Sequence, residues 1–160
     1  MRVTIRKASP DDLGLIHDIR RDAILGIESD DLDDPQAWAD RRSPEFFADR
    51  VAAGDVVVAV SGSSALGWGS SSGDCVTGVY VRPSSGRMGV GCAILSRLED
   101  EIAKRGHEFA TLESSPNARR FYVELGYTSV GPPDEDGAVP MRKALRVPGS
   151  RLAEEHEERR

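Results

Sequence analysis

One stretch constrains the fold more than any other, because a strand-like run, a glycine-rich turn and a helical repeat follow one another without interruption. The run Cys75-Val76-Thr77-Gly78-Val79-Tyr80-Val81 is rich in residues that favour strands. The turn over 82–91 contains three glycines: Gly86, Gly89 and Gly91. Beyond it, apolar residues recur at helical spacing at Val90, Ile94, Leu98 and Ile102. We therefore predict an α/β fold in which a strand enters a helix through a tight turn.

The remaining periodicity adds elements on both sides of this stretch. Apolar runs predict strands at 3–7, 56–60, 65–69, 109–113, 127–130 and 139–145. Helices are predicted to begin at Ser9-Pro10, Pro35, Pro44 and Ser115-Pro116. The segments over 56–81 indicate an antiparallel meander with a turn at 70–73. Gly78 indicates a bulge, and Pro140 an edge strand or a bulge. The predicted order is β-α-α-β-β-β-α-β-α-β-β, around a mixed sheet.

Length and charge exclude several classes of function. The 160 residues suit one domain, predicted over 1–146, followed by a charged tail over 147–160 that we expect to be disordered. A net charge of −6 argues against a nucleic-acid partner. The two cysteines, Cys75 and Cys92, lack metal-ligand spacing, so we predict no metal site. No apolar run is long enough for a membrane span, and we expect a cytoplasmic protein without a membrane partner.

The turn over 82–91 has the features of a phosphate-binding loop. Glycines let the main chain approach an anion closely, and the start of a helix presents unpaired N–H groups with a partial positive charge. A diphosphate would suit this arrangement, with Arg87 adding charge. The turn matches neither the nucleoside triphosphatase loop nor the dinucleotide fingerprint. Taken alone, such a turn is as often a tight connection between two elements.

Two motifs resemble those of the GNAT superfamily of CoA-dependent N-acetyltransferases. Val81, Pro83, Gly89 and Gly91 match its central pattern V-x-P-x-x-Q/R-x-x-G-x-G/A, whereas Gly86 stands where Gln or Arg is usual. Downstream, Ala118-Arg119-Arg120-Phe121-Tyr122 and Gly126-Tyr127 resemble the pattern A-x-x-F-Y-x-x-x-G-F/Y. The resemblance covers about residues 2 to 146. It implies a GNAT fold with a mostly antiparallel sheet of six to seven strands and about four helices.

The resemblance also implies acetyl-CoA as cosubstrate and assigns residues to it. In this family, pantetheine pairs with the strand before the turn. By position, the Val79 amide would polarise the thioester carbonyl, and the Val81 backbone would hold the pantetheine amides. Asn117 would contact the CoA arm. The pyrophosphate would be held by Gly86, Arg87, Met88, Gly89, Val90 and Gly91.

The same resemblance suggests the catalytic groups. Tyr122 would be the general acid that protonates the departing CoA thiolate, and it would also contact CoA. Glu113, at the end of a predicted strand, is the best-placed carboxylate for the general base. It could instead be a rim residue or an ion-pair partner of Arg119. Asp74, a water chain, or an amine that arrives neutral are the other possibilities for the base.

The acceptor site would be shaped by the first two helices and the loop between them. Five carboxylates lie in this loop between Glu28 and Asp34, which favours a cationic amine unless the loop is simply solvated. Aromatic residues could line the acceptor pocket or fill the core: Trp38, Phe46, Phe47 and Trp68. His17 is interpreted as a surface or packing residue. A small-molecule or peptide amine is thus the expected partner, and such folds often form homodimers.

The predicted activity is transfer of an acetyl group to a primary amine by direct attack in a ternary complex. Two alternatives remain open at this stage. The chain could be an acyl-CoA-binding module without catalysis, because it lacks an obvious base and carries Gly86 at a motif position. It could also use another acyl-CoA or another acceptor.

Overall fold

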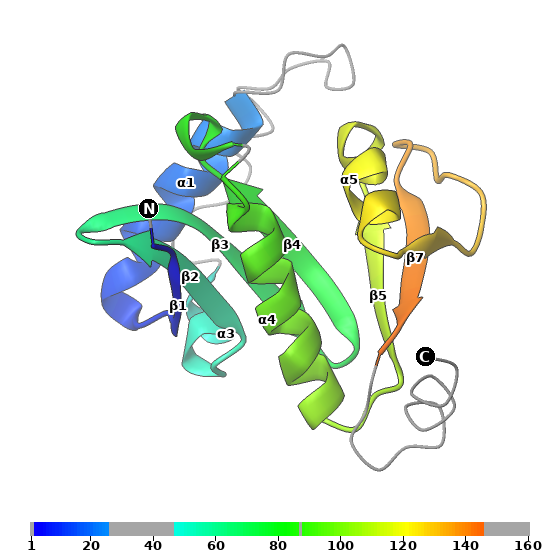
Figure 1. Ribbon diagram of the computed structural model, residues 1–160, viewed down its shortest axis with the longest axis horizontal. Helices are drawn as coiled ribbons and strands as arrows, with labels where there is room; N and C mark the ends of the chain where they lie inside the picture. The colour runs from blue at the N-terminus through cyan, green and yellow to red at the C-terminus, as the bar shows by residue number, and fades with distance from the viewer. Residues whose placement is uncertain (1, 26–46, 87, 146–160) are drawn as a thin grey trace. The chain divides into compact units, whose positions relative to one another are not determined.

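The computed structural model describes residues 2–25, 47–86 and 88–145. The strands are β1 (Thr4–Lys7), β2 (Val56–Ser61), β3 (Ser64–Ser72), β4 (Cys75–Val81), β5 (Phe109–Ser114), β6 (Thr128–Ser129) and β7 (Val139–Ala144). The helices are α1 (Leu13–Leu25), α3 (Ala48–Ala52), α4 (Val90–Lys104) and α5 (Arg119–Glu124), and they can be followed along the chain in Figure 1. Short 3-10 helices lie at Pro10–Asp12, Pro83–Ser85 and Pro116–Ala118.

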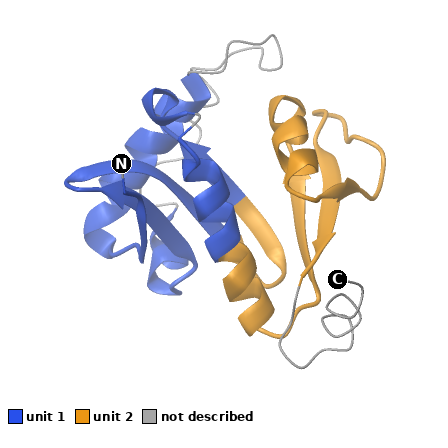
Figure 2. Cartoon of the chain, in the orientation of Figure 1, with its two compact units in different colours: residues 1–70, 78–97 blue, residues 71–77, 98–160 orange. Residues whose placement is uncertain are grey.

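The strands form one hydrogen-bonded sheet of seven in the order β1-β2-β3-β4-β5-β7-β6. The pairing of β4 with β5 is parallel, and the other described pairs are antiparallel. The predicted fold class and element order are therefore confirmed. The chain divides into two compact units, coloured in Figure 2. Unit 1 comprises Met1–Ser70 and Gly78–Arg97, and unit 2 comprises Ser71–Thr77 and Leu98–Arg160.

Unit 1 is built on the packing of α1 against the meander. Ile16 and Ile19 on α1 are fully buried and join a core cluster with Phe47, Val51, Val56, Val58 and Trp68. The Trp68 indole N–H donates to the Ile16 carbonyl at 2.9 Å, so the largest core side chain also has its polar atom satisfied. Ile24, on the same helix, is also buried.

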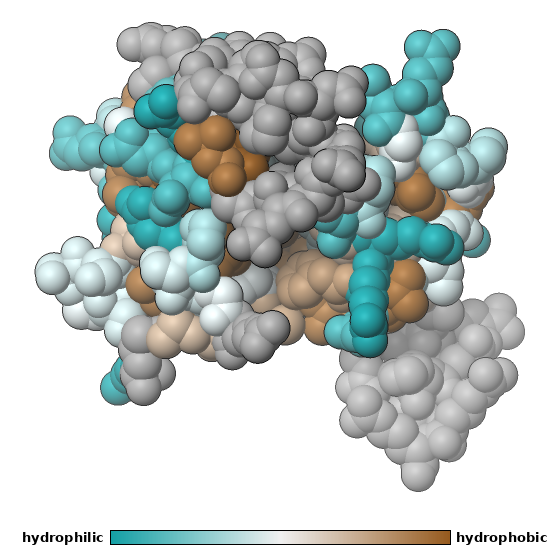
Figure 3. Space-filling model, turned by 90° about the horizontal axis from the view of Figure 1, so that it is seen from above, coloured by the Kyte–Doolittle hydropathy of each residue, from teal (hydrophilic) through white to brown (hydrophobic). Residues whose placement is uncertain are grey.

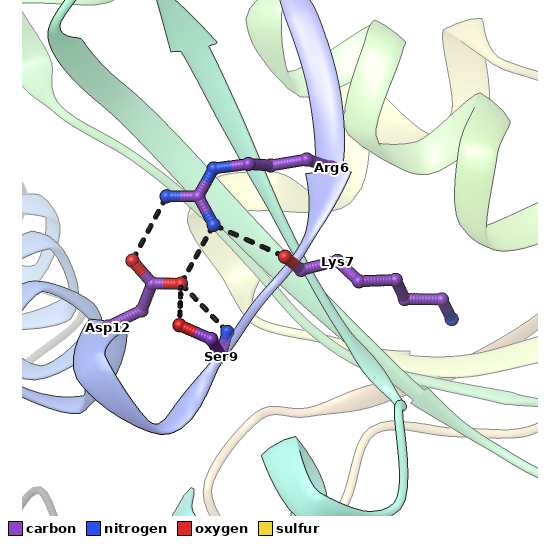
Figure 4. Close-up of polar contacts among 4 residues, drawn as sticks. All are labelled: Arg6, Lys7, Ser9 and Asp12. Carbon is purple, nitrogen blue, oxygen red and sulfur yellow. Dashed lines mark hydrogen bonds and ion pairs between the residues drawn. The ribbon is translucent and has the colours of Figure 1, made fainter.

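A buried carboxylate ties β1 to the start of α1 (Figure 4). Asp12 accepts two bonds from the Arg6 guanidinium, at 2.8 and 3.0 Å, and one from the Ser9 backbone N–H at 2.8 Å. The Arg6 hydrogen bond is the largest cause that lowers the pKa of Asp12 from 3.8 to about 2. The predicted helix start at Ser9-Pro10 places Asp12 in the first turn, but the sequence does not predict the ion pair with Arg6.

Unit 2 is centred on β5, β7 and the C-terminal half of α4. All six residues of β5 pair with β7, from Phe109↔Ala144 to Ser114↔Val139. Leu98, Ile102 and Ala110 are fully buried. The start of β4 joins this unit through the parallel pair Cys75↔Thr111. Gly126, with φ 100°, ends the segment that contains α5, as is typical of glycine after the last turn of a helix.

Three local predictions need correction. The turn predicted over 70–73 begins later, because β3 continues to Ser72 and both Ser70 and Ser71 are buried. Pro140 does not lie on an edge strand, since β7 lies between β5 and β6. Proline is tolerated at this position because its missing N–H is not needed: β6 ends at Ser129. Toward β6, Pro140 uses only its carbonyl, which accepts from the Val130 N–H at 2.9 Å. The charged residues of the helix over 90–104 predict an exposed position for Glu101, but it is buried, because it lies seven residues after Ile94 and so on the same face of α4.

The surface of the described residues is mixed. Hydrophobic residues lie among hydrophilic ones on the face drawn in Figure 3. Within the described ranges, the large apolar side chains that are exposed are Leu25, Met88, Val123 and Val130. The predicted helix starts at Pro35 and Pro44, the acidic loop over 28–34 and the tail over 147–160 lie outside the described residues.

We expect Asp12→Asn to destabilise the protein at neutral pH by about 1 kcal/mol. A pKa lowered by nearly two units would give about twice that, but the Arg6 side chain is 44% exposed and solvent weakens the pair. Because the folded-state pKa is lowered, the stabilisation is complete above pH 3.8 and is lost as the pH falls through about 2.

Urea unfolding of both proteins at pH 7, 4 and 2.5 measures this effect. The difference in the free energy of unfolding between wild type and Asp12→Asn should shrink between pH 4 and pH 2.5. Asp11→Asn is the matched control, because Asp11 is adjacent and exposed, and it should change stability by less than about 0.5 kcal/mol. A gap that does not depend on pH would contradict this role of Asp12.

Candidate functional site

The turn after β4 is held by main-chain hydrogen bonds within unit 1. The Arg82 N–H donates to the Leu66 carbonyl on β3 at 2.9 Å. The Ser85 N–H donates to the Arg82 carbonyl at 2.8 Å, and the Gly86 N–H to the Pro83 carbonyl at 3.1 Å. Ser85 is buried, whereas Pro83 is exposed. The sequence predicts a turn here, and the structure shows that it contains a 3-10 helix at Pro83–Ser85 between β4 and α4.

Gly89 is the residue at which the turn becomes helix. Its φ is 77°, a conformation that residues with a side chain rarely adopt. Its carbonyl accepts the first bond of α4, from the Ala93 N–H at 3.0 Å. The amides of Val90 and Gly91 therefore fall in the first helical turn, where the helix itself offers no acceptor. A Cβ placed on Gly89 would meet no protein atom within 4 Å, so backbone conformation alone accounts for this glycine within the described residues.

Gly86, the departure from the family pattern, has a different role. Its backbone is extended, with φ −61° and ψ 149°, so any residue could adopt that conformation. Its N–H already has a partner within the turn, as described above. A Cβ at this position would approach the Pro83 carbonyl oxygen to 3.3 Å, which a small shift could accommodate. Arg87 lies outside the described residues, and Met88 is exposed. Which of these groups contact a phosphate stays a prediction.

Val79 and Val81 lie on β4, as predicted, and both are partly buried. They alternate with Tyr80, whose ring lies against Trp68 at a centroid distance of 4.9 Å. A Cβ on Gly78 would lie 2.7 Å from the Tyr80 ring, so the glycine makes room for that ring. The alternation places Val79 and Val81 on the opposite face from Tyr80. The predicted bulge at Gly78 stays a prediction.

The predicted catalytic residues belong to unit 2. Tyr122 lies on α5 and is 8% exposed, with its ring 5.2 Å from that of Phe121 and 5.7 Å from that of Tyr127. Glu113 is exposed on β5, and Asn117 is exposed in the 3-10 helix before α5. Asp74, the other candidate base, has a carboxylate oxygen 3.3 Å from the Thr111 hydroxyl. Of the two residues, Glu113 is exposed and Asp74 is partly buried.

Sequence reasoning missed a partly buried polar cluster around Tyr127, whose ring lies against that of Tyr122. The Tyr127 hydroxyl donates to Glu99 at 2.8 Å, and the Lys143 ammonium lies 3.0 Å from the same carboxylate. Burial is the main cause that raises the pKa of Tyr127, with Glu99 adding to it. The Tyr127 backbone N–H also donates to the Tyr122 carbonyl at 3.0 Å. No sequence signal linked these residues, because Glu99 lies on α4, Tyr127 just before β6 and Lys143 on β7.

Two negative findings apply to the described ranges. No helix there is both long and apolar enough to cross a membrane. Among the same residues, no group of three or more His, Cys, Asp or Glu side chains is arranged to hold a metal ion.

A family model for the GNAT acetyltransferase domain matches residues 17–145. The chain belongs to the GNAT family. The match includes both β4 with its turn and the α5 segment, so both motifs noted in the sequence lie inside it. The expected family membership is thus confirmed, while the roles of individual residues stay predictions. No curated protein matches the chain.

Solved GNAT structures share the fold along nearly the whole chain. A GCN5-related N-acetyltransferase from Rhodopseudomonas palustris is 23% identical, with a TM-score of 0.81 over 91% of this chain and 97% of its own. The PaiA N-acetyltransferase of Thermoplasma acidophilum, in complex with coenzyme A, is 20% identical, with a TM-score of 0.74 over 91% and 100%. YncA of Salmonella typhimurium, with its cofactor acetyl-CoA, is 22% identical, with a TM-score of 0.68 over 91% and 95%.

We expect Gly89→Ala to destabilise the free protein by about 1 to 2 kcal/mol, because alanine is strained at this positive φ. Asparagine tolerates the conformation better, so Gly89→Asn should cost less. Since a side chain here meets no protein atom, both variants should fold. Chemical denaturation of the two variants measures the difference. Equal stability of Gly89→Ala and wild type would show that the residue does not need its glycine conformation.

Proposed function

We propose that the chain is an N-acetyltransferase that uses acetyl-CoA and a primary amine. The observation that carries the proposal is the turn at Gly89, which leads from β4 to the first-turn amides of the long helix α4. This turn occurs in a chain of the GNAT family. Amides at a helix start, with the partial positive charge of that end, suit a pyrophosphate. The open space beside Gly89 lets an anion approach the main chain closely.

In this proposal the turn binds and orients the cosubstrate. The amides of Val90 and Gly91 hold the pyrophosphate, with Met88, Gly89 and Arg87 around it. Gly86 closes the turn through its bond to Pro83. The main chain of Val79 and Val81 binds the pantetheine arm and polarises the thioester carbonyl. A backbone N–H aimed at a developing oxyanion contributes about 3 kcal/mol to transition-state stabilisation. Asn117, exposed in unit 2, contacts the CoA arm.

The reaction would proceed by direct attack, without a covalent acyl-enzyme. The amine nitrogen forms a bond to the acetyl carbon while the carbon–sulfur bond breaks. Glu113, the exposed carboxylate, accepts the proton that leaves the nitrogen, and Tyr122 gives a proton to the thiolate. Tyr122 suits a proton donor because its side chain is buried and its ring lies against two aromatic neighbours, which favours a single orientation.

The net charge of −6 supports a cationic amine as the acceptor, either a small molecule or a peptide side chain. A homodimer is the assembly that we propose, on the frequency of dimers among such folds.

Calorimetry with CoA, followed by a thiol-release assay over an amine library, tests the activity. CoA binding without turnover of any amine would favour an acyl-CoA-binding module. Turnover of a longer acyl-CoA in preference to acetyl-CoA would change the donor.

We expect Tyr122→Phe to lower kcat about 100-fold while CoA affinity stays within about twofold, because only the proton donor is lost. Thiol release and calorimetry measure the two quantities. Tyr127→Phe is a matched control, since it removes the neighbouring hydroxyl and keeps the ring. It should cost about 1 to 2 kcal/mol of stability by leaving Glu99 without that donor, and it should change kcat less than about threefold. An unaltered kcat in Tyr122→Phe would exclude Tyr122 as the acid.

A further inference from the structure

Arg82 lies at the junction between β4 and the turn, and its side chain makes contacts that the family pattern does not account for. Its Nε donates to the Ala65 carbonyl on β3 at 3.0 Å. Its Nη1 lies 3.3 Å from a carboxylate oxygen of Asp22 on α1. The guanidinium thus spans from the sheet to α1, with the side chain 27% exposed and that of Asp22 50% exposed.

The main chain of Arg82 takes part in the same arrangement. Its N–H donates to the Leu66 carbonyl on β3, and its own carbonyl accepts from the Ser85 N–H. The main chain of Arg82 therefore connects β3 to the 3-10 helix. Its φ of −59° and ψ of 135° fit the extended conformation required before Pro83. Contacts of its N–H, its carbonyl and two of its guanidinium nitrogens therefore hold Arg82 in place.

β3 and β4 approach each other closely just before this junction. A Cβ on Gly67 would lie 2.6 Å from the Tyr80 carbonyl oxygen and 3.3 Å from the Val81 Cα. Gly67 allows this approach, and the Arg82 bonds to Ala65 and Leu66 hold the end of β4 at it. The direction in which the chain leaves β4, and hence the place where α4 begins, depends on this contact.

We propose that Arg82 is a positioning residue for the cofactor-binding turn. It acts through Ser85 and Gly86, without touching CoA, because its Nε and Nη1 are directed to Ala65 and Asp22. The bond from Nε to Ala65 carries most of the effect. The pair with Asp22 contributes less, since its carboxylate is half exposed and water screens it. The inference rests on the proposed CoA site, but the effect on the turn itself exists in the free protein.

The first test measures CoA affinity by calorimetry in wild type, Arg82→Lys, Arg82→Met and Asp22→Asn. Lysine keeps the charge but cannot supply the planar Nε donor. We expect both Arg82 variants to bind CoA about tenfold more weakly, and Asp22→Asn to stay within about threefold. Arg120→Met is the control for loss of a charge, because Arg120 is 91% exposed in its pair with Glu124. It should bind CoA like wild type.

Dephospho-CoA separates positioning from direct contact with the 3′-phosphate. A positioning residue weakens CoA and dephospho-CoA by the same factor, whereas a direct contact to that phosphate weakens only CoA. A contact to the pyrophosphate would be kept by Arg82→Lys. Wild-type affinity in Arg82→Lys, or a loss confined to CoA, would therefore overturn the proposal.

The second test is amide hydrogen exchange in the protein without CoA. In Arg82→Lys, the Ser85 and Gly86 amides should exchange about tenfold faster, while the amides of β5 in unit 2 keep their rates. The thermal midpoint should fall by only a few degrees, which separates a local effect from general destabilisation. Unchanged exchange at Ser85 and Gly86 would overturn the proposal. If wild type does not bind CoA, the proposed function fails, and the exchange result still decides the role of Arg82.

Discussion

The candidate site depends on one backbone conformation, the positive φ of Gly89, which lets the chain leave a 3-10 turn and begin α4 at Val90. Without that conformation, the first amides of α4 would not follow directly from β4. Ile94 and Leu95, near the start of α4, are buried, and the Ile94 side chain lies close to Gly67 on β3. Glycine adopts this left-handed conformation without strain, so α4 can begin at Val90, and burial of its apolar residues stabilises it there.

Much of the fold could be predicted because its signals are local. The stripe of Val90, Ile94, Leu98 and Ile102 is completely buried, since helical spacing alone places these residues on one face. The bounds of β4 agree with the prediction at both ends, because glycine or proline punctuates the chain nearby. The position of the turn was predictable for the same reason. Its hydrogen bonds, including that of Gly86 to Pro83, were not.

Features set by tertiary contacts could not be predicted in this way. Ser70 and Ser71 form part of β3 because partner strands and burial override their weak preference for strands. Asp12 is a residue type that is common at the start of helices, yet its pKa is lowered mainly by Arg6, which lies on β1. For the proposed catalytic residues, the sequence indicated which side chains to consider. Only the structure distinguishes the exposed Glu113 from Asp74, whose carboxylate lies beside Thr111.

The departure at Gly86 and the contacts of Arg82 have a common consequence. A glycine at position 86 has no side chain that could stabilise the turn. Its backbone is extended, and it contributes to the turn through the hydrogen bond from its N–H to the Pro83 carbonyl. On the other side of the same 3-10 helix, Arg82 bonds to Ala65 and Leu66. In the part of the turn that the structure describes, the bracing therefore comes from the residue that precedes Pro83. A chain that has glycine at position 86 should then tolerate substitution there better than at Arg82.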